Sequence, residues 1–589
     1  MKKIKVRIGI LCFPLLMISC SDYLDMPMIS TSINQDTIFS KRANAELFLW
    51  DVYKSNVPFG IPKYTTVQGV LGGVQRYHED YDQIERCIRG ALTDECNFSQ
   101  GYAPATEMNL QGYSATNSRL WEAKYKAHYT GIRKAFVFIE NIDRASDISQ
   151  EEKEMMKSEC RTLIALRYFT LMRSFGGVPL VKKTLEVNED FNIQRSSIED
   201  CVNYIVELCD QSMNLPDRYD SKWRGRVTKG VALAVKARTL LYAASPLYNT
   251  NEPFIGYGNA EQDALLCYTN TDIERWRTAY EANKAVLDWA ETVGNVSIIN
   301  TGDPFADYGN ATSTKDNQEV IFANKVVVNE TGFTTHYLPT LAKFNKGNSI
   351  LVNALYKFYK SDGSEQAWPD LEVVSPFTEY KSKMSEMEAR FRVMGWVYGE
   401  APAMCPNRYS WDYNVNGKLS QDVQGAAVMM KWTYNYQGQA DIDFPVFRLA
   451  EFYLNYAEAL NEYSPNDQLA YDALNVIRSR AGLPEISKSD SRYNSQNTFR
   501  ELIRRERFIE LFGEDHRIYD VRRWKIAHTP GVIGGPMLAF GLNQNAGLTN
   551  YDSYYSYVFE NRYWADKMYY HPFPQNEINK GYLLQNPGY

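Results

Sequence analysis

Helical periodicity dominates the first half of the chain. Apolar residues recur every three or four positions in six segments, which predicts amphipathic helices at 43–54, 120–142, 151–175, 198–213, 228–244 and 273–289. Gly177 and Pro179 follow the third segment and Pro246 follows the fifth, as expected where helices stop. Small residues such as Ala232 and Ala234 favour close packing. The pattern predicts antiparallel hairpins in a tetratricopeptide-like array, although the repeat consensus of about 34 residues is not literally present.

The pattern changes between residues 295 and 443. Gly, Asn, Asp, Ser and Tyr become frequent, the helical period fades, and short apolar runs such as 319–322 predict brief strands. Long loops are usually functional or disordered. The aromatic residues of this segment favour an ordered, functional insert: Trp368, Phe377, Trp396, Tyr398, Trp411 and Tyr413.

Helical periodicity returns at Phe447. One predicted helix starts there, the next is expected to begin with Ser464 as its N-cap and to stop at Gly482, and a third spans 498–512. We interpret the Tyr-dense end of the chain as turn-rich. The expected fold is mainly α, a tetratricopeptide-like helical hairpin scaffold with long loop-rich insertions that carry short strands.

The amino terminus has the layout of a secretory signal. A basic stretch, residues 2–7, precedes an apolar run, residues 8–18, that is too short to cross a bilayer, which needs about 20 residues. The run ends at Ser19 and Cys20, and a small residue before a cysteine resembles the lipobox of bacterial lipoproteins. Cleavage would leave Cys20 as a lipidated terminus that tethers the protein to a membrane without spanning it. The alternative is an ordinary secreted protein with a chance cysteine.

These patterns divide the chain into four segments. Residues 1–19 are the predicted lipoprotein signal, 20–294 an N-terminal helical region, 295–443 a loop-rich functional insert, and 444–589 a C-terminal helical region. We expect 20–589 to form one compact unit.

Charge and aromatic content narrow the function classes. The formal net charge is −7, and it becomes −11 once the four basic residues of the signal, Lys2, Lys3, Lys5 and Arg7, are removed. No basic stripe remains that could follow a phosphate backbone, so we expect no nucleic acid partner. The chain contains 42 Tyr and 11 Trp, and aromatic faces at a surface suit sugar rings.

Inward carboxylates raise the question of catalysis. Glu506 lies on the apolar face of its predicted helix, and Glu451 and Glu458 lie beside another. Such groups could be the acid and base of a glycosidase. Many arginines lie close by, however, and arginine is the natural bidentate partner of a buried carboxylate: Arg448, Arg478, Arg480, Arg504, Arg505, Arg517, Arg522 and Arg523. We interpret the carboxylates as members of structural ion pairs and expect no enzyme activity.

The sequence predicts neither a metal nor another cofactor. The six His are not spaced as HExxH or HxH, and no Cys pair has CxxC spacing. We expect buried free thiols at Cys87, Cys96, Cys160, Cys201, Cys209, Cys267 and Cys405. Asp362 and the pair Asp441 and Asp443 could contribute to an irregular calcium site, but as turn residues they need no metal.

The segment from residue 94 to 119 has the composition of a sugar site. Ring faces can stack on the C–H surface of a pyranose while amide or carboxylate groups bind its hydroxyls. The candidate ligand residues are Asp94, Phe98, Tyr102, Asn109 and Tyr113. A few such stacks could support a dissociation constant between millimolar and micromolar, which suits a carrier that must release its cargo. The alternative is a hydrated loop whose aromatic residues pack on the helices beneath.

Several motifs occur in a fixed order along the chain. They are RTLIALRYF and FGGVPLV within 161–181, the segment 227–248, RLAEFYLNYAEA at 448–459, NVIRSRAGLP at 475–484, RERFIEL at 505–511, RRW at 522–524, HPFP at 571–574 and QNPGY at 585–589. In this order, behind a lipobox, they resemble the SusD/RagB family of outer-membrane nutrient-binding lipoproteins.

The resemblance implies a fold, a location and partners. It implies a tetratricopeptide-like scaffold with a loop-built ligand face, lipid-anchored at the outer membrane and facing the cell exterior, that captures oligosaccharide without catalysis. It also implies a SusC-like TonB-dependent transporter that the lipoprotein caps as a lid. By analogy, the ligand face uses aromatic residues from the loop after Asp94 and from the middle insert, which adds Tyr337 and Trp368 to the candidates.

The sequence leaves three alternatives to a glycan carrier. A peptide receptor, as in the RagB branch, is compatible with the acidic mature chain and the Tyr-rich loops. A surface glycosidase would release products from a polysaccharide. A purely structural helical scaffold would bind a membrane partner but no small ligand.

Overall fold

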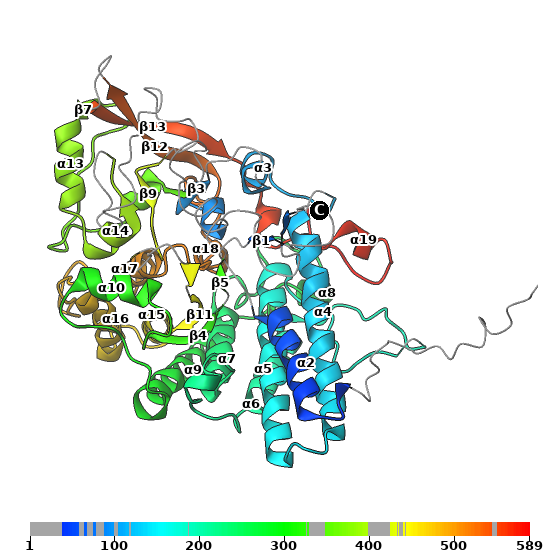
Figure 1. The fold of residues 1–589 in the computed structure, drawn as a ribbon. Helices are drawn as coiled ribbons and strands as arrows, with labels where there is room; N and C mark the ends of the chain where they lie inside the picture. The colour runs from blue at the N-terminus through cyan, green and yellow to red at the C-terminus, as the bar shows by residue number, and fades with distance from the viewer. Residues whose placement is uncertain are drawn as a thin grey trace, which may run out of the picture.

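Most of the chain is described by the computed structural model. The described residues are 38–57, 64–66, 75–77, 88–98, 104–116, 119–186, 188–325, 327–328, 348–398, 425–432, 434, 440–441, 443–544 and 551–589. This part of the chain is mainly helical, as predicted (Figure 1). None of its helices is both long and apolar enough to span a bilayer.

Consecutive helices of the first half pack against one another (Figure 1). The array runs through α2 (Arg42–Asn56), α4 (Arg119–Asn141), α5 (Gln150–Phe175), α6 (Ile198–Asp210) and α7 (Lys229–Ala244). These helices are confirmed at the predicted positions, with ends shifted by less than one turn. Ser149 caps α5 with a full capping box, and Gly176 ends it with a φ of +80°.

The array continues into the C-terminal region. α9 (Glu274–Trp289) contacts both α7 and α15 (Leu449–Tyr463), and α15 contacts α16 (Gln468–Arg480) and α17 (Gln496–Glu510). Helices from the two ends of the chain therefore share one core, because α15 packs on helices more than 150 residues earlier in the sequence.

Two predicted helix starts are wrong. Phe447 belongs to strand β11 (Phe444–Arg448), so α15 starts two residues later. The N-cap of α16 is Asp467, whose carboxylate accepts the backbone N–H of Leu469 at 3.0 Å, and not Ser464. Asn466 has a φ of +65°, a left-handed conformation that a helix beginning at Ser464 could not pass through.

The segment 295–443 carries the expected short strands and also helices. β4 (Val320–Asn324) pairs antiparallel with β11, and β5 (Val327–Val328) pairs with β10 (Ala440–Asp441). A four-stranded sheet has the order β3 (Cys96–Phe98), β6 (Asn348–Ile350), β9 (Ala427–Met429) and β8 (Gly395–Trp396). The helices, which the fading period did not predict, are α10 (Pro304–Ser313), α12 (Val352–Leu355), α13 (Phe377–Ser385) and α14 (Ala389–Met394).

The longest strands lie in the segment interpreted as a turn-rich tail, which is a correction. β12 (Gly535–Gln544) and β13 (Tyr551–Arg562) pair antiparallel, and β7 (Ser375–Pro376) adds to the other side of β13. Tyrosine is a good strand former on a half-buried surface, which the turn-rich interpretation overlooked. Gly541 leaves room for the ring of Tyr555 on the paired strand.

Short elements complete the described fold. They are β1 (Tyr64–Thr66), β2 (Gln75–Tyr77), η2 (Arg89–Leu92), α3 (Pro104–Gln111), η3 (Ile142–Arg144), η4 (Ser221–Trp223), α8 (Ala260–Asp263), η5 (Ala290–Gly294), α18 (Arg517–Arg523), η7 (Asp566–Tyr569) and α19 (Gln575–Ile578). Four of the predicted free thiols are buried and confirmed as free: Cys160, Cys201, Cys209 and Cys267. Cys96 is buried as well, and its thiol contacts Asn348. Cys87 and Cys405 lie outside the described residues.

Candidate functional site

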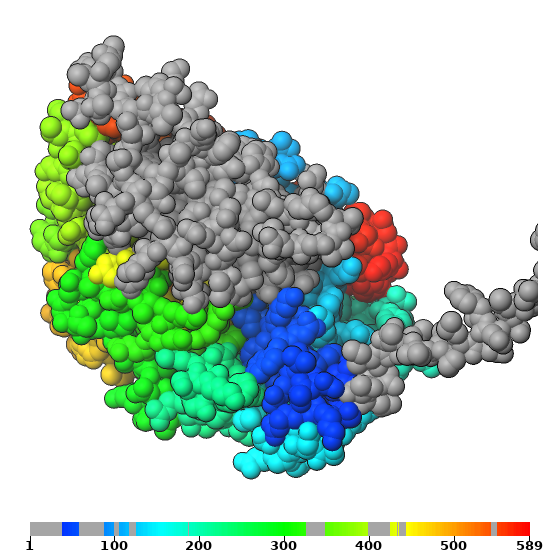
Figure 2. All heavy atoms as spheres, in the orientation of Figure 1, coloured from blue at the N-terminus to red at the C-terminus, as the bar shows by residue number. Residues whose placement is uncertain are grey.

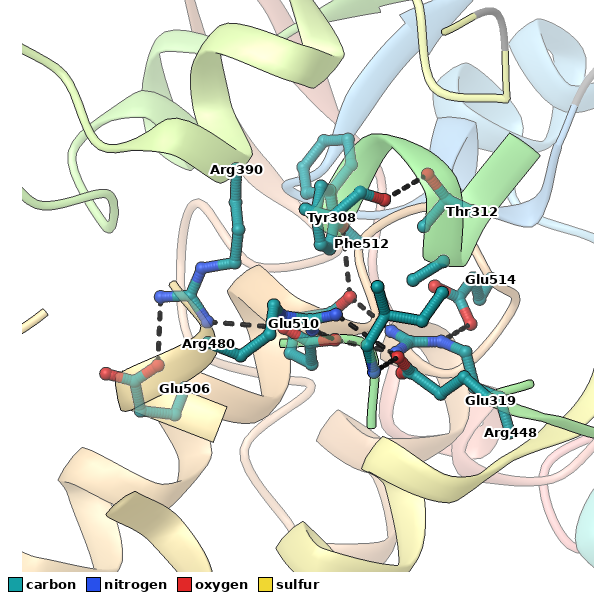
Figure 3. Close-up of polar contacts among 12 residues, drawn as sticks. Tyr308, Thr312, Glu319, Arg390, Arg448, Arg480, Glu506, Glu510, Phe512 and Glu514 are labelled. Atoms are coloured by element: carbon teal, nitrogen blue, oxygen red, sulfur yellow. Dashed lines mark hydrogen bonds and ion pairs between the residues drawn. The ribbon is translucent and has the colours of Figure 1, made fainter. Parts of the chain in front are cut away.

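The inward carboxylates belong to two buried ion-pair networks. Figure 3 shows most of the first, in which side chains from α10, α14, α16, α17, β11 and the residue before β4 converge. It contains five cations and five carboxylates whose side chains are at most 3% exposed: Arg390, Lys431, Arg448, Arg478, Arg480, Glu319, Glu388, Glu506, Glu510 and Glu514. Among the described residues, this network therefore has one carboxyl group for each basic side chain.

Glu510 lies at the centre of this network. Its carboxylate accepts hydrogen bonds from Arg448 Nη1 at 2.6 Å, from Arg390 Nη1 at 3.4 Å and from Arg480. Burial by itself would raise the pKa of Glu510, but the charges of Arg480, Arg448 and Arg390 outweigh it and hold the pKa well below its usual range. The group therefore stays ionised and paired.

The second network joins α7, α15, α17 and α18. It pairs Arg238 with Glu451, Arg523 with Glu458 and Asp520, and Arg507 with Asp520. Despite burial, Arg523 and Arg507 lower the pKa of Glu458 to about 2. The prediction that Glu451, Glu458 and Glu506 form structural ion pairs is confirmed.

Four of the predicted ligand residues are buried in the scaffold. Both carboxylate oxygens of Asp94 accept hydrogen bonds from Arg517 on α18, each at 2.8 Å. Phe98 lies in β3, Asn109 on α3, and Tyr113 just after α3, and their exposed fractions are 3%, 6% and 5%. In this conformation their side chains contact protein, and their role as ligand contacts stays a prediction.

The other predicted residues are distributed elsewhere. Trp368 is half-buried and packs on Phe540 of β12, with 5.7 Å between ring centroids. Tyr102, Tyr337 and the lipidation residue Cys20 lie outside the described residues, as does the signal segment 1–19.

An open pocket with aromatic walls lies where α2, η4 and the end of β4 meet. Its volume is about 460 Å³, within the range of about 300–1,000 Å³ that is usual for small-ligand sites. It is lined by Trp50, Tyr53, Lys54, Val57, Lys222, Trp223, Arg224, Gly225, Arg226, Phe322, Ala323, Asn324 and Lys325. Figure 2 shows the blue surface of α2 beside green surface from the middle of the chain, so segments distant in sequence meet on this face.

Local structure places the two tryptophans of this aromatic pocket. α2 buries Ala45, Leu49 and Val52 against the core, which leaves Trp50 on the edge of the buried face. Trp223 is fixed by Asp220, which caps η4 and accepts the Trp223 backbone N–H at 3.1 Å. The two indole rings stack with 5.9 Å between centroids and 21° between planes, and both are half-buried.

Three hydrogen-bonded side chains, Arg226, Glu159 and Tyr53, form the base of the aromatic pocket. Arg226 pairs with Glu159 on α5 through two hydrogen bonds, the one from Nε at 3.0 Å, and Tyr53 donates its hydroxyl to the same carboxylate. The Arg226 guanidinium lies 5.6 Å from the Trp50 ring centroid and 5.5 Å from that of Trp223. Burial opposes the charge of Arg226, but the hydrogen bonds to Glu159 raise its pKa above the usual value. The base is a fixed cation below an aromatic wall.

A second pocket of about 350 Å³ shares Arg224, Gly225 and Arg226 with the first. Its lining also includes Trp289, whose indole N–H donates to Asp217 at 3.0 Å. Gly225 has a φ of +103°, and a side chain there would come within 2.9 Å of Lys325. The turn at Gly225 therefore lets the 224–226 segment line both pockets.

The sequence analysis did not single out Trp50, Trp223 or Arg226. Trp50 belongs to an ordinary amphipathic helix, and Trp223 lies between two helices. One local signal was available: Trp223 and three basic residues occur within five positions, between α6 and α7. The approach of α2 to this turn is a tertiary contact that no local pattern encodes.

The described residues contain no group of three or more His, Cys, Asp or Glu side chains placed to hold a metal ion. Asp362 acts as a turn residue, accepting the backbone N–H of Ser364 at 2.9 Å. The expectation of no cofactor stays a prediction.

Comparison with known sequences and structures identifies relatives over most of the chain. The family model described as SusD family matches residues 304–589, and the one described as "Starch-binding associating with outer membrane" matches 65–241. SusD-like protein P2 of Formosa agariphila is 30% identical over 436 residues, which are 72% of each chain. SusD-like protein P25 of the same organism is 23% identical, over 80% of this chain and 81% of its own.

Solved structures share the fold. A SusD-like protein of Bacteroides fragilis has a TM-score of 0.72 at 23% identity and covers 95% of this chain and 99% of its own. A SusD-like carbohydrate-binding protein from the same species has a TM-score of 0.67 at 20% identity, with 93% and 99% covered. The sequence relatives and the shared fold agree with the order of motifs along the chain, and the protein belongs to the SusD/RagB family.

Proposed function

We propose that this protein is a lipid-anchored, cell-surface binding protein that captures oligosaccharide and passes it to a SusC-like TonB-dependent transporter of the outer membrane. The observation that carries glycan binding is the stacked Trp50–Trp223 pair at an open pocket in a SusD-family chain. Indole faces suit the C–H faces of pyranose rings, each contact contributing on the order of 0.5–1.5 kcal/mol beyond area burial.

The anchoring and delivery steps rest on different support. The lipobox at Cys20 supports a tether, and one of the matching family models carries the description "Starch-binding associating with outer membrane". Delivery to a transporter rests on family resemblance. The absence of catalysis is supported by the arginine partners of Glu451, Glu458 and Glu506, the carboxylates that the sequence offered as an acid and a base.

The test is a binding panel with a parallel activity assay. The soluble chain Ser21–Tyr589 is screened against polysaccharides, oligosaccharides and peptides by affinity electrophoresis and calorimetry, while released reducing sugar is measured. We expect glycan binding without sugar release. Sugar release would contradict the carrier function, and binding of peptides alone would place the protein with peptide receptors.

Delivery needs its own experiment. Co-purification from outer membranes, with Cys20→Ala as the unanchored control, should recover a TonB-dependent barrel with the anchored protein. Recovery of no barrel with the wild-type protein would contradict the delivery step and leave glycan binding standing.

A further inference from the structure

The aromatic pocket differs in charge from the rest of the molecule. The whole chain has a formal net charge of −7, yet among the described residues that line this pocket every charged one is a cation: Lys54, Lys222, Arg224, Arg226 and Lys325. A cationic pocket in an acidic protein concentrates anions locally, because the pocket walls limit screening by water.

Among the described residues, only some of these cations have an ion-pair partner. Arg226 pairs with Glu159, while Arg224 and Lys325 both pair with the single carboxylate of Asp316. Lys54 and Lys222 form no ion pair with any described residue. Among the described residues, Lys54 and Lys222 are therefore the pocket cations that an acid group of a ligand could pair with.

The cations lie next to the surfaces that would hold a sugar ring. The Lys222 ammonium is 4.8 Å from the Trp223 ring centroid, and Arg226 lies against both indoles. A ring stacked on either indole would place its substituents within reach of these groups.

We infer that the aromatic pocket binds an acidic sugar unit, a uronate or a sulfated pyranose, with the ring on the Trp50–Trp223 wall and the acid group on the rim lysines. This inference rests on the proposed glycan-binding function and names its ligand class. Neutral sugars would use the same wall but gain nothing from the lysines.

The experiment compares matched probes by calorimetry on the soluble chain. The probes are an oligogalacturonate, a sulfated galactan oligosaccharide and a neutral galacto-oligosaccharide of equal length, with poly-glutamate as an acidic peptide. We expect at least one acidic sugar to bind, and its affinity to fall as salt rises from about 0.05 M to about 0.5 M, since exposed charges are screened. The two acidic probes decide between carboxylate and sulfate.

Variants then locate the site. Lys54→Ala with Lys222→Ala should weaken acidic sugar binding about fivefold to tenfold, the effect of two exposed charge pairs, and leave neutral sugar binding unchanged. Trp223→Ala should weaken all sugar binding by about tenfold. Lys488→Ala and Phe191→Ala, at exposed positions that line neither pocket, are the matched controls and should change nothing. Circular dichroism and thermal unfolding confirm that each variant is folded.

The outcomes separate the two proposals. Binding of neutral sugars alone would overturn the acidic ligand and leave the glycan carrier intact, whereas binding of no glycan would overturn both. Acidic sugar binding that the lysine and tryptophan variants leave unchanged would overturn the pocket as its site. Equal, lysine-dependent binding of poly-glutamate would overturn the assignment to sugar.

Discussion

The buried ion-pair network and the aromatic pocket contain the same kinds of side chain, but among the described residues the charges are balanced in the network and not in the pocket. Both contain arginine paired with glutamate, and in both a guanidinium lies against an aromatic ring: Arg480 is 5.2 Å from the Tyr308 ring centroid, and Arg226 lies against Trp50 and Trp223. In the network five cations meet five carboxylates away from water, whereas in the pocket Lys54 and Lys222 have no ion-pair partner among the described residues. The paired charges of the network stabilise the scaffold. We propose that the lysines at the rim of the aromatic pocket, which have no ion-pair partner among the described residues, pair with a ligand.

The two regions are linked through one strand. Glu319, just before β4, pairs with Arg448 of β11 at 2.9 Å within the network. The other end of β4 supplies Phe322, Ala323 and Asn324 to the pocket wall. The network therefore fixes the strand that forms part of the pocket wall.

The largest expected effect on stability comes from removing one carboxylate of the ion-pair network. Glu510→Ala would leave Arg390, Arg448 and Arg480 short of a carboxylate in the core and should lower the free energy of unfolding by about 3–5 kcal/mol. Urea unfolding followed by circular dichroism measures it. Glu501→Ala removes an exposed partner of Arg504 and should cost no more than about 1 kcal/mol. Equal losses of stability in the two variants would contradict the distinction between buried and exposed ion pairs.

Glu95 is an unmatched carboxyl within the scaffold. It accepts the backbone N–H of Gly513 at 2.9 Å, forms no ion pair with a described residue, and its other oxygen has no hydrogen-bond partner. Burial, with the nearby charge of Asp94, raises the pKa of Glu95 to about 8 despite that hydrogen bond. The folded protein therefore holds a proton on Glu95 that the unfolded chain releases above its ordinary pKa.

This proton makes stability depend on pH in a defined direction. The contribution of Glu95 is full at low pH and declines between its ordinary pKa and about 8, by at most about 1.4 kcal/mol per pH unit. Glu95→Gln keeps the hydrogen bond from Gly513 and does not titrate, so its stability advantage over wild type should grow from pH 5 to pH 8. Urea unfolding at several pH values measures the difference, and a constant difference would show that Glu95 is ionised when folded.

A smaller effect is expected at the base of the pocket. Tyr53→Phe removes a hydroxyl that donates to Glu159 and accepts the backbone N–H of Val227 at 2.8 Å. The loss should cost about 1–3 kcal/mol, because the Val227 N–H is left without its partner. Thermal unfolding measures it. Tyr563→Phe, at a side chain that is 42% exposed, is the control and should leave the midpoint unchanged.

The smallest effect on stability is expected at the rim. Lys222→Ala removes an exposed cation that has no carboxylate partner among the described residues, and it should change the free energy of unfolding by no more than about 0.5 kcal/mol. The same variant is expected to weaken acidic sugar binding, so its affinity for the acidic sugar should fall while its stability stays nearly unchanged. A large loss of stability would instead make Lys222 part of the scaffold.

The sequence predicted the scaffold better than the site. The helices α2, α4, α5, α6, α7 and α9 follow from local periodicity, and the ion pairs of Glu451, Glu458 and Glu506 follow from the cost of burying an unpaired charge. The hairpin of β12 and β13 was missed because tyrosine serves both turns and strands. Trp50 and Trp223 were missed because 172 residues separate them and only the tertiary fold brings their rings together.

The measurement that tests the central claim most directly is calorimetric titration of wild-type Ser21–Tyr589 and its Trp223→Ala variant with the same oligosaccharide panel. The account predicts that the wild type binds a glycan with a dissociation constant between about millimolar and micromolar. It also predicts that a folded Trp223→Ala variant binds the same glycan about tenfold more weakly. Equal affinity of the two proteins for that glycan would show that the aromatic pocket is not its binding site.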